Sequence, residues 1–76
     1  MSDREFLVEA NTQDVLKFMI EEMQLSITDA MRQFYASEVF DKLQNFETGL
    51  YLESPAYIYE MYKNERKENG IVQDEI

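Results

Sequence analysis

The chain is short and strongly acidic: of its 76 residues 16 are acidic and 7 are basic, which gives a net charge of −9 at pH 7. This charge disfavours nucleic acid and anionic membranes as partners, because both are bound through clustered Lys and Arg. His, Cys and Trp are all absent, so the common general base, the thiolate nucleophile and the soft metal ligands are missing. Hydrophobic residues nevertheless make up 45% of the chain, which is enough to build a core and argues against disorder.

A chain of this length is expected to form one domain, since it can bury only about 60% of its unfolded surface. We predict a single helical domain over residues 1–70 and a mobile tail over residues 71–76. Without cysteine or histidine, association with a partner is the remaining way to stabilise so small a core. Residues 1–5 lack the basic start of a signal peptide, and no apolar run approaches the roughly 20 residues that span a bilayer. We therefore expect a cytoplasmic protein.

The first eleven residues predict a helical start. Ser2 and Glu5 have the spacing of a capping box before an apolar run, in which each side chain accepts a hydrogen bond from the other residue's backbone N–H group. The first helix is therefore expected to start near Asp3 and to run through Asn11. A short strand over residues 6–8 is the less favoured alternative.

A second helical pattern covers residues 12–23, with Asn11 or Thr12 as its N-terminal cap. Its apolar residues recur at helical spacing. They form one wide face, which contains Val15, Leu16, Phe18, Met19, Ile20 and Met23.

Two shorter helices follow, each opened by a hydroxyl side chain. Ser26 or Thr28 is expected to cap a helix that ends near Tyr35, with an apolar stripe of Ile27, Ala30, Met31 and Phe34. Ser37 is expected to cap a third helix that ends near Asn45, with Val39, Phe40 and Leu43 facing inward. One long bent helix through Ser37 is the alternative.

The chain breaks clearly where its only proline and the first of its two glycines fall close together. Thr48 and Gly49 predict a turn, and residues 50–52 predict an extended step. This linker should fold the last helix back over the others.

Ser54 and Pro55 predict the start of that last helix, because serine accepts bonds from free N–H groups and proline has no N–H to satisfy. We expect it to run to about Asn69 and to be closed by Gly70. Its buried stripe should contain Ile58, Met61 and Tyr62, extended by Tyr59. Three basic residues should complement the negative end of the helix dipole: Lys63, Arg66 and Lys67.

The residue types that drive catalysis are scarce. Glu21 and Glu22 are the nearest approach to paired carboxylates, but neighbours in a helix point about 100° apart and cannot share a substrate atom. Carboxylate metal sites in helical bundles need Glu-x-x-His spacing, and phosphate loops need a glycine-rich turn with Lys. We therefore predict a protein that is not an enzyme and has no catalytic, cofactor-binding or metal-binding residue. Small-molecule binding or hydrolysis at Glu21, Glu22 or Glu60 is the remaining enzymatic alternative.

Aromatic residues carry the clearest functional signal. Eight of them fall between positions 34 and 62, which is too many for all to be buried in so small a domain. Tyrosine and methionine are favoured at recognition surfaces. We predict an interaction surface formed by Tyr51, Tyr57 and Tyr59; ordinary core packing of these residues is the alternative.

Three sequence blocks between residues 12 and 66 resemble those of a group of short bacterial proteins of unknown function. The blocks are Ile20-Glu21-Glu22, Phe34-Tyr35-Ala36-Ser37 and the segment with Thr48-Gly49-Leu50-Tyr51 and Ser54-Pro55-Ala56-Tyr57. Such proteins are similar to the small partner proteins encoded beside toxin-like genes. Those toxin-like genes include ones that resemble ADP-ribosyltransferase genes. The resemblance implies an antitoxin-like or accessory role, and it supplies no catalytic residue.

Together these features predict an all-α, compact domain of three or four helices, with the last helix packed across the first two. The leading hypothesis is a non-enzymatic acidic protein-interaction module that binds a basic surface on another bacterial protein. The alternative is a homodimeric structural domain closed by its Tyr and Met side chains.

Overall fold

The computed structural model describes residues 3–74, and over residues 68–74 it describes the backbone only. This part of the chain forms four α-helices and no strand, so the all-α prediction is confirmed. The helices are α1 (Asp3–Met23), α2 (Ile27–Tyr35), α3 (Glu38–Gln44) and α4 (Pro55–Asp74). Two 3-10 helices link α3 to α4, and they are η1 (Phe46–Thr48) and η2 (Leu50–Leu52).

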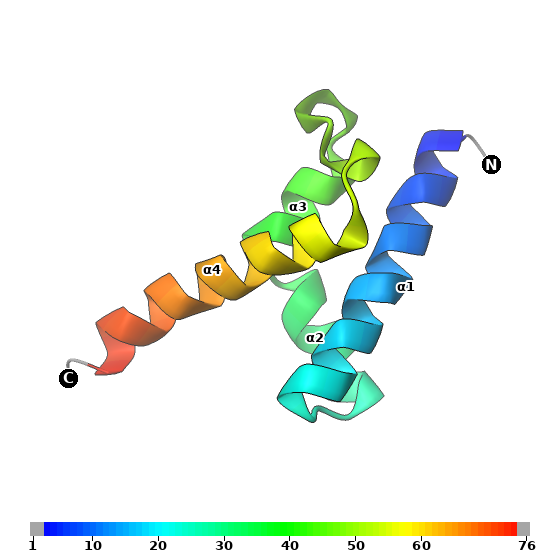
Figure 1. The fold of residues 1–76 in the computed structure, drawn as a ribbon. Helices are drawn as coiled ribbons and strands as arrows, with labels where there is room; N and C mark the ends of the chain where they lie inside the picture. Colours follow the sequence, from blue (N-terminus) through cyan, green and yellow to red (C-terminus); the bar gives the residue numbers. More distant parts are fainter. Residues whose placement is uncertain (1–2, 75–76) are drawn as a thin grey trace.

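The helices do not form a parallel bundle (Figure 1). α2 returns beside α1, and α4 crosses the other helices so that its C-terminal part projects beyond them. α4 packs mainly against α1 and α3. It also reaches α2, where the rings of Phe34 and Tyr62 meet edge to face with centroids 5.5 Å apart. The prediction that α4 lies across the first two helices therefore names two of its neighbours, α1 and α2, and omits α3.

The core is a single cluster to which every α-helix contributes. Phe34 lies at its centre, fully buried, with the ring of Phe40 5.4 Å away on one side and Tyr62 on another. Among the described residues, the other fully enclosed apolar side chains are Val15, Met19, Ala30, Leu43 and Ile58. Burial of this apolar surface is the main stabilising term for the fold.

α1 is one continuous helix over residues 3–23, as expected for a helix that starts near Asp3 and runs through Asn11. Neither Asn11 nor Thr12 caps a helix. Both residues lie within α1, and their side chains are buried in the protein. Thr12 Oγ1 donates to the Val8 carbonyl at 2.7 Å. Asn11 Nδ2 donates to the Tyr51 carbonyl at 3.0 Å, in a residue forty positions away. The strand alternative over residues 6–8 is also wrong, since these residues are helical.

Three of the predicted serine caps are confirmed, while the cap predicted at Ser2 lies outside the described residues. Each serine Oγ accepts a hydrogen bond from the backbone N–H group three residues on, as an N-terminal cap requires. The pairs are Ser26 with Asp29 at 3.1 Å, Ser37 with Phe40 at 3.1 Å, and Ser54 with Tyr57 at 3.2 Å. Ser37 thus separates α2 from α3, rather than lying inside one bent helix.

The linker and the end of α4 bring two corrections. Gly49 has φ of 72° and makes the predicted turn, but residues 50–52 form the 3-10 helix η2 instead of an extended step. α4 continues through Gly70 to Asp74, so the helix end predicted at Asn69 is wrong. Residues 75–76 of the expected tail lie outside the described residues, and the mobility of that tail stays a prediction.

Candidate functional site

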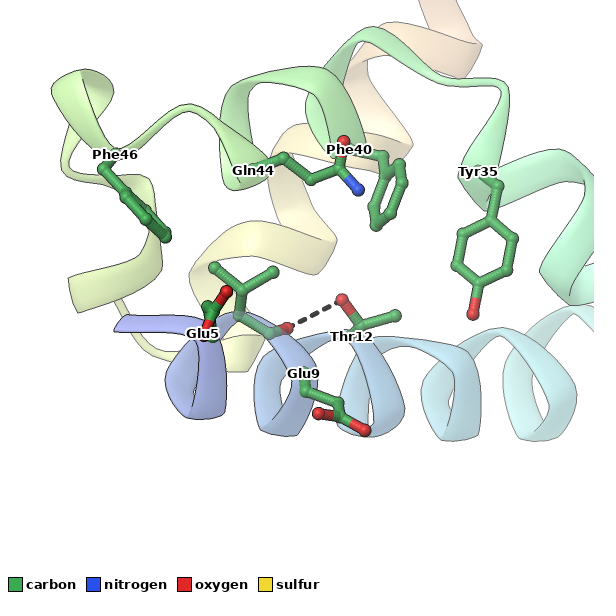
Figure 2. Close-up of a pocket in the computed structure, with 8 residues that line it drawn as sticks. Glu5, Glu9, Thr12, Tyr35, Phe40, Gln44 and Phe46 are labelled. Carbon is green, nitrogen blue, oxygen red and sulfur yellow. Dashed lines mark hydrogen bonds between the residues drawn. The ribbon is translucent and has the colours of Figure 1, made fainter. Parts of the chain in front are cut away.

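A groove of about 370 Å³ lies beside the N-terminal half of α1 (Figure 2). One side is formed by α1, through Val8, Thr12 and two glutamates. The opposite side carries three aromatic rings from three consecutive elements, together with Gln44; they are Tyr35 at the end of α2, Phe40 on α3 and Phe46 on η1. We call this feature the aromatic groove.

The three rings point from their elements toward α1 (Figure 2), and each is held by a neighbouring ring. The Tyr35 and Phe40 centroids are 4.8 Å apart. Phe40 in turn contacts the buried Phe34, which ties this wall to the core. Phe46 meets Tyr51 edge to face at 5.5 Å. Such ring pairs favour fixed orientations, so the groove is formed in advance of any ligand.

The α1 side of the groove is acidic at its mouth. Glu5 and Glu9 are one helical turn apart and exposed, and the Glu9 carboxylate points away from the rings in Figure 2. The Thr12 hydroxyl already donates to the Val8 carbonyl. Apolar and aromatic side chains thus line the interior, while carboxylates stand at the edge, an arrangement that suits an apolar ligand bearing positive charge.

The apolar surface continues outside the groove along α2. Ile27, Met31 and Tyr35 follow one another at four-residue spacing and therefore share one face of that helix. Their exposed fractions are 63%, 37% and 43%. The predicted stripe of α2 is therefore only half correct: Ala30 and Phe34 are buried, whereas Ile27 and Met31 face solvent.

The predicted surface of Tyr51, Tyr57 and Tyr59 is not brought together in this way. Tyr59 is only 4% exposed, and its ring packs on Phe18 with centroids 5.2 Å apart. Tyr51 is half-buried against the core. Tyr57 is 51% exposed and lines a separate hollow beside α4. Of the three, only Tyr57 is open to a partner.

The acidic residues considered for catalysis do not lie in the aromatic groove, and two of them bond to other side chains. Glu22 accepts a hydrogen bond from the Tyr59 hydroxyl at 3.5 Å. Burial of Tyr59, together with the negative charge of Glu22, raises the pKa of this phenol. Glu60 binds Lys63 at 2.9 Å and by this hydrogen bond raises the pKa of the Lys63 ammonium. None of these carboxylates lines the aromatic groove.

The basic cluster near the end of the chain has a different setting from the predicted one. Because α4 continues to Asp74, Lys63, Arg66 and Lys67 lie in its middle rather than in its last turn. Arg66 Nη1 donates to Gln33 Oε1 at 2.5 Å, which joins α4 to α2. The interaction of these three basic residues with the helix dipole is therefore small.

One long-range contact between α4 and α3 was not predicted from the sequence. Both carboxylate oxygens of Glu65 accept hydrogen bonds at the start of α3. The donors are the backbone N–H groups of Glu38 and Val39, each at 3.1 Å. The groove residues were also missed. The four-residue spacing from Ile27 to Tyr35 is the one local signal that could have indicated them, if read as an exposed rather than a buried stripe.

Two further features bear on the function. Among the side chains of residues 3–67, no group of three acidic residues is arranged to hold a metal ion, and no described helix is long and apolar enough to cross a membrane. The chain matches no protein-family model, no curated protein and no solved structure.

Proposed function

We propose that this protein is a non-enzymatic, acidic protein-interaction module, and that the aromatic groove is its binding surface. The observation that carries this proposal is the row of three rings facing α1, with Tyr35 exposed, Phe40 and Phe46 half-buried, and Glu5 and Glu9 at its edge. Aromatic side chains in a preformed hollow are typical anchors for a partner. The surrounding negative charge speeds encounter with a basic surface and discriminates against acidic ones.

The narrower form of the proposal is an antitoxin-like or accessory partner of another bacterial protein, met in the cytoplasm. It draws on the resemblance of the three sequence blocks. Masking a basic surface requires charge and contact area rather than chemistry, and the chain offers a net charge of −9 together with an uncovered apolar groove.

The experiment is purification of the tagged chain from its native organism, followed by reconstitution with the recovered partner. We expect a complex of fixed stoichiometry whose association rate falls as salt is added, because exposed charges are screened. Failure to recover any stoichiometric partner, or turnover of a metabolite by the purified chain, contradicts the proposal.

A homodimer is the second candidate, and the exposed stripe of Ile27 and Met31 is the observation that favours it. Against it stands the charge, since two copies would each bring −9 to the interface. Light scattering distinguishes the two: a concentration-independent dimer that buries this stripe supports the homodimer.

A further inference from the structure

The shape of the aromatic groove limits what can fill it. Its three rings stand in a row along α1 (Figure 2), and the row is extended by Met31 and Ile27 on α2. From Tyr35 to Ile27 the helix rises about 12 Å, at 1.5 Å per residue. A line of apolar side chains of this length matches residues at i, i+4 and i+7 on one face of a bound helix.

The charge around the groove selects the polar face of that helix. Glu5 and Glu9 stand on the α1 side, where basic residues flanking an apolar stripe would meet them. The wall itself already accepts a cation, because the Arg4 guanidinium lies 5.5 Å from the centre of the Phe46 ring. Such a contact is attractive between a cation and an aromatic face.

We infer that the aromatic groove binds the apolar face of an amphipathic, basic α-helix from another protein. This inference rests on the proposed function and names the element of the partner that it requires. A strand is a poorer fit, since residues 3–74 offer no sheet edge to which one could add. A second copy of this chain is a poorer fit because it would bring further negative charge.

The test uses a synthetic probe and the intact chain. The probe is a peptide of about 20 residues, long enough to form a helix, with Leu at i, i+4 and i+7, Lys beside them and Ala elsewhere. Amide NMR shifts of the labelled protein map the binding site, and calorimetry at physiological salt measures affinity. We expect the shifts to cluster at the groove residues Val8, Thr12, Tyr35, Phe40 and Phe46 and to extend along α2 to Met31 and Ile27.

Matched variants separate groove binding from general attraction to an acidic protein. Tyr35→Ser should weaken binding at least about tenfold, as for an aromatic anchor, and Glu9→Lys should weaken it severalfold. Their controls are Tyr57→Ser, which removes an equally exposed ring elsewhere, and Glu21→Lys, which changes net charge by the same amount on the same helix. Each control should alter affinity less than about twofold, because distant surface charges are screened.

Several results overturn the inference. A peptide of the same composition in shuffled order, which has no apolar face, must not bind equally well. Equal weakening by Glu9→Lys and Glu21→Lys shows attraction without a site, and a dimer that Tyr35→Ser dissociates shows that a second copy fills the groove. If a native partner still binds the Tyr35→Ser and Glu9→Lys variants normally, the inference fails together with the assignment of the groove as the binding surface, while the proposal of a protein-interaction module stands. Peptide binding confined to the groove supports the inference even where no native partner is recovered.

Discussion

The two sides of α1 contrast sharply. Where α1 meets η2 and α4, polar groups are paired across the junction: Asn11 bonds the Tyr51 carbonyl and Tyr59 bonds Glu22. On the side of the groove, aromatic rings are fixed against one another but line an open hollow, and only Tyr35 among them is exposed. Phe40 belongs partly to the core, whereas the exposed Tyr35 ring is expected to contribute little to the stability of the fold. Apolar surface of this kind is a mark of binding sites.

Two neighbouring residues at the end of α2 offer the strongest test of this contrast. Phe34→Ala should cost about 3–5 kcal/mol of unfolding free energy, because a fully buried ring is replaced by a cavity. Tyr35→Ser should cost less than about 1 kcal/mol, since that ring is exposed. Urea denaturation measures both values. Because Phe34→Ala removes much of the roughly 4–11 kcal/mol expected for a domain of this size, Phe34→Leu serves as the milder variant. Equal costs at the two positions would show that the groove is part of the core.

The contrast also explains what the sequence could predict. Ser26, Ser37 and Ser54 were correctly assigned because a cap bonds an N–H group three residues away, so both partners lie in one short segment. Asn11 was misassigned as a cap because its acceptors lie forty or more residues along the chain. The groove was missed for the same reason: Phe46 and Tyr35 face α1 only once the linker and α3 have folded.

The next largest effect is expected at Asn11, on the side of α1 that packs against η2 and α4. Asn11→Ala should cost about 1–3 kcal/mol, because the carbonyls of Tyr51 and Glu53 lose the donor that reaches them. Asn11→Asp should be at least as destabilising, since a carboxylate cannot donate and is repelled by carbonyl oxygens. Thermal unfolding measures the loss. Thr12→Val is the control: its hydroxyl donates within its own helix, so it should cost less. A larger loss for Thr12→Val would contradict this account.

A smaller effect is expected at Glu65, whose carboxylate joins α4 to the start of α3. Glu65→Ala should cost about 1 kcal/mol, as for loss of an N-terminal cap, while Ser37 continues to cap the same helix. Glu60→Ala is the matched control, because it removes only an ion pair with Lys63 at the surface, where solvent screens the charges and leaves little net stabilisation. Urea titrations in low and high salt should show the Glu65 cost shrinking with salt, as helix-dipole interactions do. Indistinguishable variants would mean that the long-range cap contributes no more than a surface pair.

The smallest effect appears only in alkali and tests Tyr59. Its pKa is raised from 10.0 by burial and by Glu22, so the folded state keeps this proton when the unfolded state has lost it. The neutral phenol therefore contributes stability below pH 10, and this contribution is lost as the pH rises from 10 through the folded pKa. The raised pKa of Lys63 acts in the same direction, so the two must be separated by mutation. Tyr59→Phe should flatten the alkaline part of the curve of melting temperature against pH, whereas Tyr57→Phe, on the exposed surface, should leave it unchanged. An unchanged curve in Tyr59→Phe would assign the alkaline loss of stability to Lys63. It would also show that the Tyr59 hydroxyl does not contribute to the contact between α1 and α4.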